Sequence, residues 1–425
     1  MRYMIIGIKG SGCCALANIL KDLGEEVAGC DSDEDFYTSE KLKEIRVCNF
    51  DEVELEYNTL YIIGNAYHHH LLTQKIIREN YQYTYYPEFI ESYFKMPKIG
   101  ISGTHGKSTC TTFLSKLTDR KINALIGDGT GFGIKEAKYF VMEACEYKRN
   151  FLKFNYEYLI ILNIDYDHPD FFKNEIEYDK AFLDISKRTK CLITNYDDEN
   201  CRKIRHKNLI TFGFNNNADM VIRSVGCNVS LSYRNEVYFF DLPFSAKGYL
   251  YDFAAAFLLS LLICKNVAYL KENYKLIKMP KRRLNFYLDK VKNNVYLDDY
   301  AHHPTEIKNV LEEVKNRYPN KKLIVVFQPH TYTRSIAFFD AFKDVFKDYS
   351  EVYIAQTFSS VREVSYVDSF DETFGYKAYT FEVEKDLLKR KNVVIAFLGA
   401  GDIGNKIAFF INNKKDYWKH LSFVL

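Results

Sequence analysis

Short apolar runs alternate along the chain with segments whose apolar residues recur at helical spacing. Residues 3–8 form an apolar run that predicts a buried strand, and a glycine-containing loop and a helical pattern over 13–23 follow it. Further strands are expected at 26–30, 98–102, 139–142, 158–162 and 393–398, and helices at 111–117 and 250–264. Strand-like runs that alternate with helical patterns predict an α/β fold with mostly parallel sheets.

Two prolines divide this pattern into three units. Pro97 and Pro280 each follow a methionine, and proline and its predecessor resist helix and favour an extended linker. A chain of 425 residues also suggests about three domains. We therefore expect domains at residues 1–95, 96–279 and 280–425.

The amino-acid composition of the chain indicates which class of binding partner to expect. The 58 basic and 56 acidic residues leave a net charge of +2, so no basic excess points to nucleic acid, and small-molecule partners are expected. No run of 18 apolar residues suggests insertion into a membrane, and the N-terminal apolar run ends in glycines rather than at a signal-peptide cleavage site. The ten cysteines contain no CxxC pair, which fits reduced thiols in the cytoplasm.

The strongest local motif lies between the expected strand 98–102 and the expected helix 111–117. Backbone N–H groups of such a loop and of the following helix favour polyanions, Lys107 adds a cation for terminal phosphates, and the Ser108 hydroxyl can ligate Mg²⁺. The usual phosphate-binding loop has a further glycine where this chain has Ile101. The motif still predicts a phosphate cradle made of Gly103, Thr104, His105, Gly106, Lys107, Ser108 and Thr109.

Two acidic clusters follow neighbouring expected strands. Glu143 to Glu146 come after the strand at 139–142, and Asn163 to His168 come after the strand at 158–162. Each cluster alone would be interpreted as a solvated loop. Because the carboxyl ends of parallel strands meet at one edge, where the phosphate loop also lies, we expect these carboxylates to hold Mg²⁺.

Polar side chains also follow two expected strands of the third unit. The first group runs from Asp298 to Pro304 and includes a histidine pair, and the second runs from Phe327 to Arg334. A histidine pair can indicate zinc, but no third ligand stands at a diagnostic spacing. We interpret both groups as the lining of a substrate pocket.

Two glycine motifs remain. Gly7, Gly10 and Gly12 form GxxGxG, with Asp31 about 20 residues beyond the loop, where nucleotide-binding units place an acid near a ribose. This spacing fits either a nucleotide site or a tight turn that only packs a helix on a strand. The GxGxxG that begins at Gly399 is too close to the C-terminus for a following strand and acid, so we interpret it as a turn and helix start.

Taken together, these segments resemble the Mur ligases over nearly the whole chain. The motifs also follow the order found in that family. The resemblance is carried by GIKGSG, GTHGKST, IGDGTG, EACEY, NIDYDHPDFF, KRRLNF, DDYAHHPTEI, FQPHTYTR and LGAGDIG. Within the family, the chain is most similar to the members that add L-alanine.

The resemblance implies an ATP-dependent ligase of peptidoglycan precursor synthesis. It would join L-alanine to the lactyl carboxylate of UDP-N-acetylmuramate through an acyl phosphate, with Mg²⁺ as cofactor. A Rossmann-like first domain would bind the UDP-sugar, a P-loop ATPase-like central domain would bind ATP, and a Rossmann-like third domain would bind L-alanine.

The resemblance also assigns residues to roles. For the UDP-sugar they are Gly7, Gly10, Ser11, Gly12 and Asp31, and for ATP they are residues 103–109 with Arg283 and Asp299. For Mg²⁺ they are Ser108, Glu143 and His168, and for the alanine side they are Tyr300, His302, His330 and Arg334. The residues implied in catalysis are Lys107, His168, Arg283, His302, His330 and Arg334.

The chain departs from the family pattern in two places. In the first domain, Lys9 stands in the glycine loop, and Gly64-Asn65-Ala66 replaces Ser-Ser-Ala, so UDP contacts can differ. In the central domain, Gly248 and Tyr249 stand where relatives carry His-Asn beside the adenine. A ring at Tyr249 could stack on adenine, but the amide contact would be missing, which predicts weak discrimination between nucleotide bases.

Three other functions compete with alanine addition. A muropeptide-recycling ligase would add a preformed peptide, but His330 and Arg334 favour a small acceptor whose carboxylate meets a cation. A catalytically impaired nucleotide-binding homologue would explain the change at Gly248 and Tyr249. A nicotinamide dehydrogenase would explain the glycine motifs but not GTHGKST.

Overall fold

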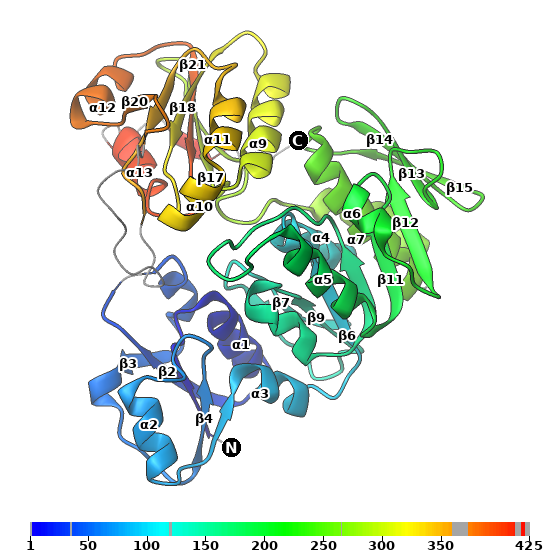
Figure 1. Ribbon diagram of the computed structural model, residues 1–425, viewed down its shortest axis with the longest axis vertical. Helices are drawn as coiled ribbons and strands as arrows, with labels where there is room; N and C mark the ends of the chain where they lie inside the picture. Colours follow the sequence, from blue (N-terminus) through cyan, green and yellow to red (C-terminus); the bar gives the residue numbers. More distant parts are fainter. Residues whose placement is uncertain are drawn as a thin grey trace.

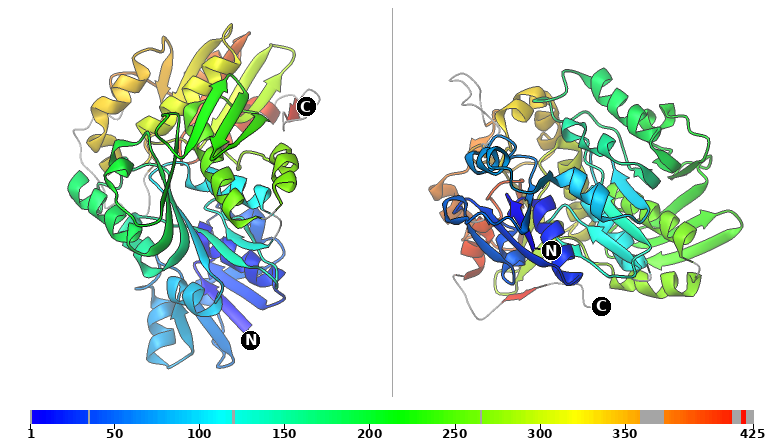
Figure 2. Two further views of the ribbon diagram at one scale, coloured as in Figure 1. Left: turned by 90° about the vertical axis from the view of Figure 1, so that its right-hand side faces the viewer. Right: turned by 90° about the horizontal axis from the view of Figure 1, so that it is seen from below.

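The computed structural model describes residues 2–34, 36–118, 121–264, 266–358, 373–412 and 418–420. The strands form three separate sheets, each built from consecutive strands and covered by helices. The first and third lobes lie at opposite ends of the long axis, and the central lobe lies beside both (Figures 1 and 2). We propose domain boundaries near residues 95 and 280, in the connections between the sheets.

The first sheet has the strand order β3-β2-β1-β4-β5, and all its neighbouring pairs are parallel. The order reverses between β1 and β4, and an open parallel sheet binds ligands at such a switch point. Its strands are β1 (Arg2–Ile6), β2 (Glu26–Asp31), β3 (Arg46–Asn49), β4 (Thr59–Ile63) and β5 (Tyr83–Tyr85). Its helices are α1 (Ser11–Asp22), α2 (Leu71–Arg78) and α3 (Tyr86–Tyr93), with short 3₁₀ turns η1 (Ser39–Leu42) and η2 (Phe50–Glu52).

The central sheet has ten strands in the order β15-β14-β13-β12-β11-β10-β6-β9-β7-β8. The strands are β6 (Lys98–Ser102), β7 (Ile122–Leu125), β8 (Gly131–Phe132), β9 (Tyr139–Glu143), β10 (Tyr156–Ile161), β11 (Thr189–Asn195), β12 (Leu209–Gly213), β13 (Met220–Val225), β14 (Asn228–Tyr233) and β15 (Glu236–Asp241). The helices are α4 (Lys107–Leu117), α5 (Glu175–Ser186), α6 (Glu199–Lys203), α7 (Lys247–Ile263) and α8 (Val267–Asn273), with η3 (Tyr147–Lys153) and η4 (Tyr274–Leu276). Strand β6 lies between β9 and β10, so the three loops that follow these strands share one edge.

The third sheet has the order β20-β19-β18-β21-β17-β16-β22. Its strands are β16 (Asn285–Asp289), β17 (Asn294–Asp299), β18 (Lys322–Phe327), β19 (Val352–Ile354), β20 (Lys377–Ala378), β21 (Val393–Leu398) and β22 (Trp418–His420). Its helices are α9 (Pro304–Arg317), α10 (Tyr332–Ala337), α11 (Phe339–Phe346), α12 (Phe381–Leu387) and α13 (Asn405–Asn412).

The α/β architecture and the dominance of parallel pairing are confirmed. Antiparallel pairing is added by β13, β14 and β15, by β8, and by β16 with its two neighbours. Helix α7 is apolar on nearly all sides, because it is buried between α4 and the sheet strands β11, β12 and β13. None of the helices described is both long and apolar enough to span a membrane.

Candidate active site

The phosphate loop connects β6 to α4. Gly103 and Gly106 both have positive φ, at 132° and 85°, which a side chain at either position would strain. Helix α4 begins at Lys107, four residues earlier than predicted, and Cys110 makes the first bond of its ladder, to the Gly106 carbonyl. The N–H groups of residues 107–109 therefore precede the ladder and face the loop, as an anion-binding helix start requires.

The Lys107 side chain lies inside this loop and is 15% exposed. Its Nζ donates to the carbonyls of Gly103 and Thr104, at 2.5 and 3.0 Å, and to Glu146 Oε2 at 3.0 Å. Burial alone would lower the pKa of Lys107, but Glu146 outweighs burial and raises it. The side chain is a cation held by groups that a phosphate would replace.

Glu146 was expected from the sequence only as one of the carboxylates of the cluster after β9 that would hold Mg²⁺, with no individual role. Its carboxylate is almost completely buried and lies between Lys107 and His168, whose Nε2 is 3.4 Å from Oε1. Burial alone would raise the pKa of Glu146, but Lys107 and His168 lower it. His168 itself has a positive φ of 56°, so its position is fixed by an uncommon backbone conformation.

Glu143 ends β9 beside the start of α4. Its carboxylate accepts a hydrogen bond from the backbone N–H of Gly127 and lies beside Ser108, and burial raises its pKa. A hydroxyl and a carboxylate thus lie side by side at the phosphate loop. These are the oxygen ligands that Mg²⁺ prefers, so the residues fit such an ion.

Ionisable side chains of the third domain form two groups near the phosphate loop. Arg283 Nη1 lies 3.1 Å from Glu306 Oε1, and His302 Nδ1 lies 3.2 Å from Glu306 Oε2. Asp299 is fully buried and accepts hydrogen bonds from the backbone N–H groups of Leu284 and Ala301, both at 2.8 Å. Burial raises the pKa of Asp299 to about 6. Asp299 therefore fixes the backbone beside Arg283, and Glu306 is the carboxylate that meets Arg283 most closely.

The residues expected on the alanine side are also brought together. The ring of His302 lies 5.4 Å from that of Tyr300 and 5.6 Å from that of His330. Arg334 Nη1 lies 3.2 Å from His330 Nδ1, and the same guanidinium pairs with Asp167 of the central domain. Burial lowers the pKa of His302 well below its ordinary value, so this ring is neutral at physiological pH.

A second contact between the two domains surrounds Asp165. His105 Nε2 lies 3.1 Å from Asp165 Oδ2, the Thr305 hydroxyl donates to the same oxygen at 2.6 Å, and His303 Nδ1 lies 3.7 Å from it. The group of His105, Asp165 and His303 has the composition of a metal site. The two imidazole rings, however, lie partly face to face, with their centroids 4.5 Å apart and their planes tilted by 41°. Because the nitrogen lone pairs lie in the ring planes, this packing does not direct both rings at one ion. The group includes His303 but not His302 of the histidine pair, and its contacts join the phosphate loop to the third domain.

In the first domain, the glycine loop is closely packed. The N–H groups of Gly7 and Ile8 both donate to the Cys30 carbonyl. A Cβ atom on Gly7 would lie 2.2 Å from a ring carbon of Tyr67, and one on Gly12 would lie 2.7 Å from the Tyr86 hydroxyl oxygen. These two glycines make room for aromatic side chains, as a packing role requires.

Asp31 lies at the end of β2, beside the loop. The Tyr67 hydroxyl donates to Oδ1 at 2.8 Å, and the Lys9 backbone N–H donates to Oδ2 at 2.7 Å. Ser11 is the first residue of α1, and its side chain lies beside the Tyr37 hydroxyl. The switch point of the first sheet is therefore lined by Ser11, Asp31 and tyrosine hydroxyls.

The C-terminal glycine motif has the structure that its position predicted. A turn at residues 399–404 precedes α13. Arg282 donates to the carbonyls of Gly399 and Gly401, at 2.6 and 2.9 Å, and Gln328 Oε1 accepts from Ile403 N at 3.0 Å. These side chains fill the loop, as expected for a structural turn.

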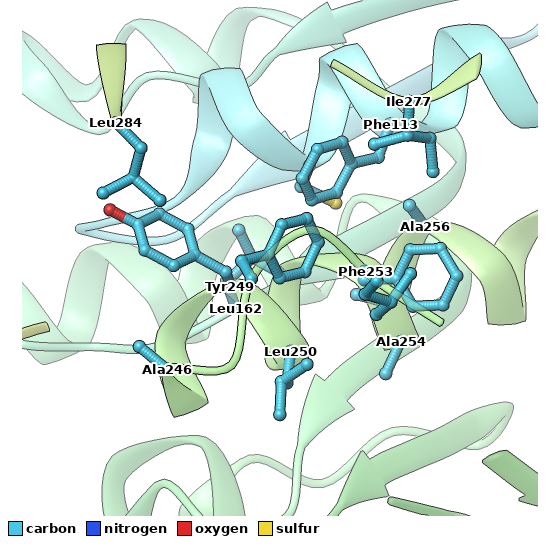
Figure 3. Packing of buried hydrophobic residues seen from close by; sticks show 14 of the residues in the cluster. Phe113, Leu162, Ala246, Tyr249, Leu250, Phe253, Ala254, Ala256, Ile277 and Leu284 are labelled. Carbon is cyan, nitrogen blue, oxygen red and sulfur yellow. The ribbon is translucent and has the colours of Figure 1, made fainter. Parts of the chain in front are cut away.

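Tyr249 does not offer the stacking surface considered from the sequence. Its side chain is 7% exposed and packs in the core around Phe113, Phe253 and Leu284 (Figure 3). The ring belongs to the apolar contact of α7 with α4 and with the third domain. The interpretation of Tyr249 as a stacking surface for adenine is therefore wrong, because other side chains already cover the ring.

Comparison with known proteins follows the same three units. The family models described as "Mur ligase family, catalytic domain", "Mur ligase middle domain" and "Mur ligase, glutamate ligase domain" match residues 2–81, 101–260 and 282–395. The chain is 36% identical to the UDP-N-acetylmuramate–L-alanine ligase of Streptococcus gordonii, over 94% of this chain and 95% of that protein.

Two solved structures show the same fold over nearly their whole length. The UDP-N-acetylmuramate-alanine ligase of Thermotoga maritima superposes with a TM-score of 0.78 at 22% identity, covering 97% of this chain and 99% of that chain. The murein peptide ligase of Psychrobacter arcticus superposes with a TM-score of 0.68 at 17% identity, covering 97% and 98%.

Proposed function

Because the chain belongs to the Mur ligase family, we propose that it is the enzyme that joins L-alanine to UDP-N-acetylmuramate at the expense of ATP. The observation that carries this proposal is the gathering of the phosphate loop, Glu143, His168 and the His302–His330–Arg334 group around one region between the central and third domains. Identities of 36% and 34% to two alanine-adding relatives, over 94% of this chain, support L-alanine as the acceptor.

The reaction forms and then consumes an acyl phosphate. The lactyl carboxylate oxygen attacks the γ-phosphorus of ATP, and the bond to the β-phosphate oxygen breaks, which releases ADP. The alanine amine, after its ammonium form has lost one proton, then attacks the acyl carbon, phosphate leaves with the electron pair of the carbon–oxygen bond, and the new amide nitrogen loses a second proton. Such steps depend chiefly on positioning and on neutralisation of charge.

Each part of the site has a proposed role in these steps. Lys107 would turn from Glu146 to the transferred phosphoryl group, and Arg283 would approach it from the third domain. Mg²⁺, held by Ser108 and Glu143 with His168 serving a second ion, would supply further neutralisation of phosphate charge. The ring of neutral His302 and the ring of His330 would face the alanine amino group, and Arg334 would meet the alanine carboxylate.

The first domain would hold the UDP-sugar at the start of α1. Ser11, Gly12 and Asp31 line this end, and α1 packs directly on β7 and β8 of the central domain. The uridine diphosphate would thus direct its sugar toward the phosphate loop. The chain's ten free cysteines fit a reducing compartment, so we propose the cytoplasm as its location.

The experiment is phosphate release with mass analysis of the product. ATP, Mg²⁺, UDP-N-acetylmuramate and L-alanine together are expected to give phosphate and a product that carries one alanine. Omission of any one component should stop both signals, and the Lys107→Ala variant should do the same. Phosphate release that does not require the UDP-sugar would contradict the proposal.

A further inference from the structure

The N-terminal end of α7 is capped by the third domain rather than by its own side chains. Ala246 precedes α7 and offers no side-chain acceptor. Glu313 on α9 accepts from the backbone N–H groups of Ser245 and Ala246, at 2.7 and 2.8 Å, and its side chain is almost completely buried. Helix α9 therefore lies directly against the start of α7.

Between these contacts, the carboxamide of Asn309 occupies the space beside Gly248. A Cβ atom on Gly248 would lie 2.7 Å from Asn309 Nδ2 and 3.3 Å from Oδ1. Gly248 is the second residue of α7, so the amide from α9 stands where a side chain of the first turn of α7 would otherwise project.

This amide lies within reach of a nucleotide bound at the phosphate loop. Asp252, one turn beyond Gly248 on α7, contacts Gly106, where a Cβ atom would lie 2.1 Å from its Oδ1. Glu306, three residues before Asn309 on α9, lies 3.8 Å from His105 Nδ1. One helical turn is about 5 Å, so Asn309 lies roughly one turn away from the phosphate loop along both helices. That separation is shorter than a nucleoside triphosphate, so a nucleotide held by the loop can reach Asn309.

Asn309 is also chemically available. Its side chain is partly exposed, and within the described residues it takes part in no hydrogen bond. A carboxamide presents one acceptor and two donors. It can therefore accept from the exocyclic amine of adenine while it donates to N7, whereas guanine presents two acceptors at these positions.

We propose that Asn309 recognises the base of the nucleotide and confers preference for adenine over guanine. The inference rests on the proposed use of ATP and deepens it. It reverses the sequence-based expectation of weak base discrimination, because the amide missing from residues 248 and 249 is supplied by α9. Since Asn309 belongs to the third domain, base recognition depends on the contact between the third and central domains.

The test compares nucleotide binding by the full-length protein and two variants. Dissociation constants for Mg²⁺-ADP and Mg²⁺-GDP are measured by calorimetry, and kcat/KM is measured with ATP and GTP. The wild-type chain should prefer adenine by at least about 10-fold, and Asn309→Ala should remove most of that preference by weakening ADP binding. The matched control is Asn316→Ala, which removes another α9 amide, the one that bonds the Ser245 hydroxyl, and should keep the preference.

A second variant tests the hydrogen-bond pattern without changing side-chain size. Asn309→Asp replaces the donor by a carboxylate and should also lose the preference for adenine. An unchanged ADP to GDP ratio in both Asn309 variants, or equal binding of ADP and GDP by the wild-type chain, would overturn the inference. Binding of neither nucleotide would instead contradict the proposed ATP-dependent ligation, and the inference would fall with it.

Discussion

The guanidinium of Arg334 and the carboxylate of Asp167 form a two-point ion pair that joins the third domain to the central domain. Nε lies 2.9 Å from Oδ1, and Nη2 lies 3.2 Å from Oδ2, with both side chains buried. Burial alone would raise the pKa of Asp167, but Arg334 holds it well below its usual range. A buried pair of this geometry is costly to break on one side only.

The first prediction concerns stability. Asp167→Ala and Arg334→Ala should each lower the free energy of unfolding by about 3–5 kcal/mol, because each leaves one buried charge without its partner. The double variant should lose clearly less than the sum, since neither charge remains. Denaturant unfolding of the wild-type chain, the two single variants and the double variant gives the coupling free energy of the pair. If the losses of the two single variants add up to the loss of the double variant, the pair does not stabilise the domain contact.

The second prediction separates the domain contact from alanine binding. If alanine's carboxylate replaces Asp167 on the guanidinium, Arg334→Ala should raise the KM for L-alanine by at least about 10-fold and that for ATP much less. Asp167→Ala frees the same guanidinium and should not raise the KM for alanine. Steady-state kinetics decides the matter, with exposed Arg202→Ala as the control. An equal rise in both KM values for Arg334→Ala would reduce its role to holding the domains together.

The third prediction concerns the phosphate loop. Lys107→Ala should lower turnover by at least about 100-fold, because it removes the cation facing the transferred phosphoryl group. The substitution also leaves the buried carboxylate of Glu146 without its closest cation. The double variant Lys107→Ala/Glu146→Gln removes the negative charge of Glu146 as well, so it avoids this unpaired charge. Both should be inactive in phosphate release, and thermal unfolding checks that the double variant is folded. Near-normal turnover by either folded variant would refute the assignment.

The fourth prediction concerns the metal. Glu143→Ala should raise the Mg²⁺ concentration needed for half-maximal activity, since it removes the carboxylate that meets Ser108 beside the phosphate loop. Glu136→Ala changes an exposed acid on a nearby loop and should leave the Mg²⁺ titration unchanged. Superimposable titrations for Glu143→Ala and the wild-type chain would remove Glu143 from the metal site.

The fifth prediction concerns pH. Burial lowers the pKa of His303 from its ordinary 6.5 to about 4. Between about pH 4 and 6.5 the unfolded chain therefore binds more protons at this residue than the folded chain does. The stability that neutral His303 contributes is fully present above about pH 6.5, and about 3 kcal/mol of it is lost as the pH falls to 4. His303→Asn keeps a residue suited to begin α9 and removes the titration. Unfolding measured between pH 4 and 7 should depend less steeply on pH in this variant, and an identical slope would contradict the buried neutral state.

Sequence patterns predicted the local structure around the phosphate loop well. The strand at residues 98–102 and the buried helix α7 lie within a few residues of their expected bounds, because apolar runs and helical spacing are local signals. The start of α4 was placed four residues late. The polar residues from Lys107 onward hid a helix start that the Gly106 conformation fixes.

Partners that come from distant segments were the part that sequence could not supply. Glu146 was seen only as one acid of a cluster, and its pairing with Lys107 depends on the neighbouring positions of β6 and β9. The pairing of Asp167 with Arg334 depends on how two domains meet. Asn309 carried no motif at all, and only the space left by Gly248 reveals it.

A competition between acceptors decides whether the enzyme adds one L-alanine to UDP-N-acetylmuramate. The enzyme is given ATP, Mg²⁺, UDP-N-acetylmuramate and equal concentrations of L-alanine and the L-alanyl-γ-D-glutamyl-diaminopimelate tripeptide, and the products are weighed by mass spectrometry. We expect the alanine adduct to form almost alone, since Arg334 beside His330 offers one cation for the carboxylate of a small acceptor. A product dominated by the tripeptide adduct would contradict alanine addition and would leave the membership in the Mur ligase family standing.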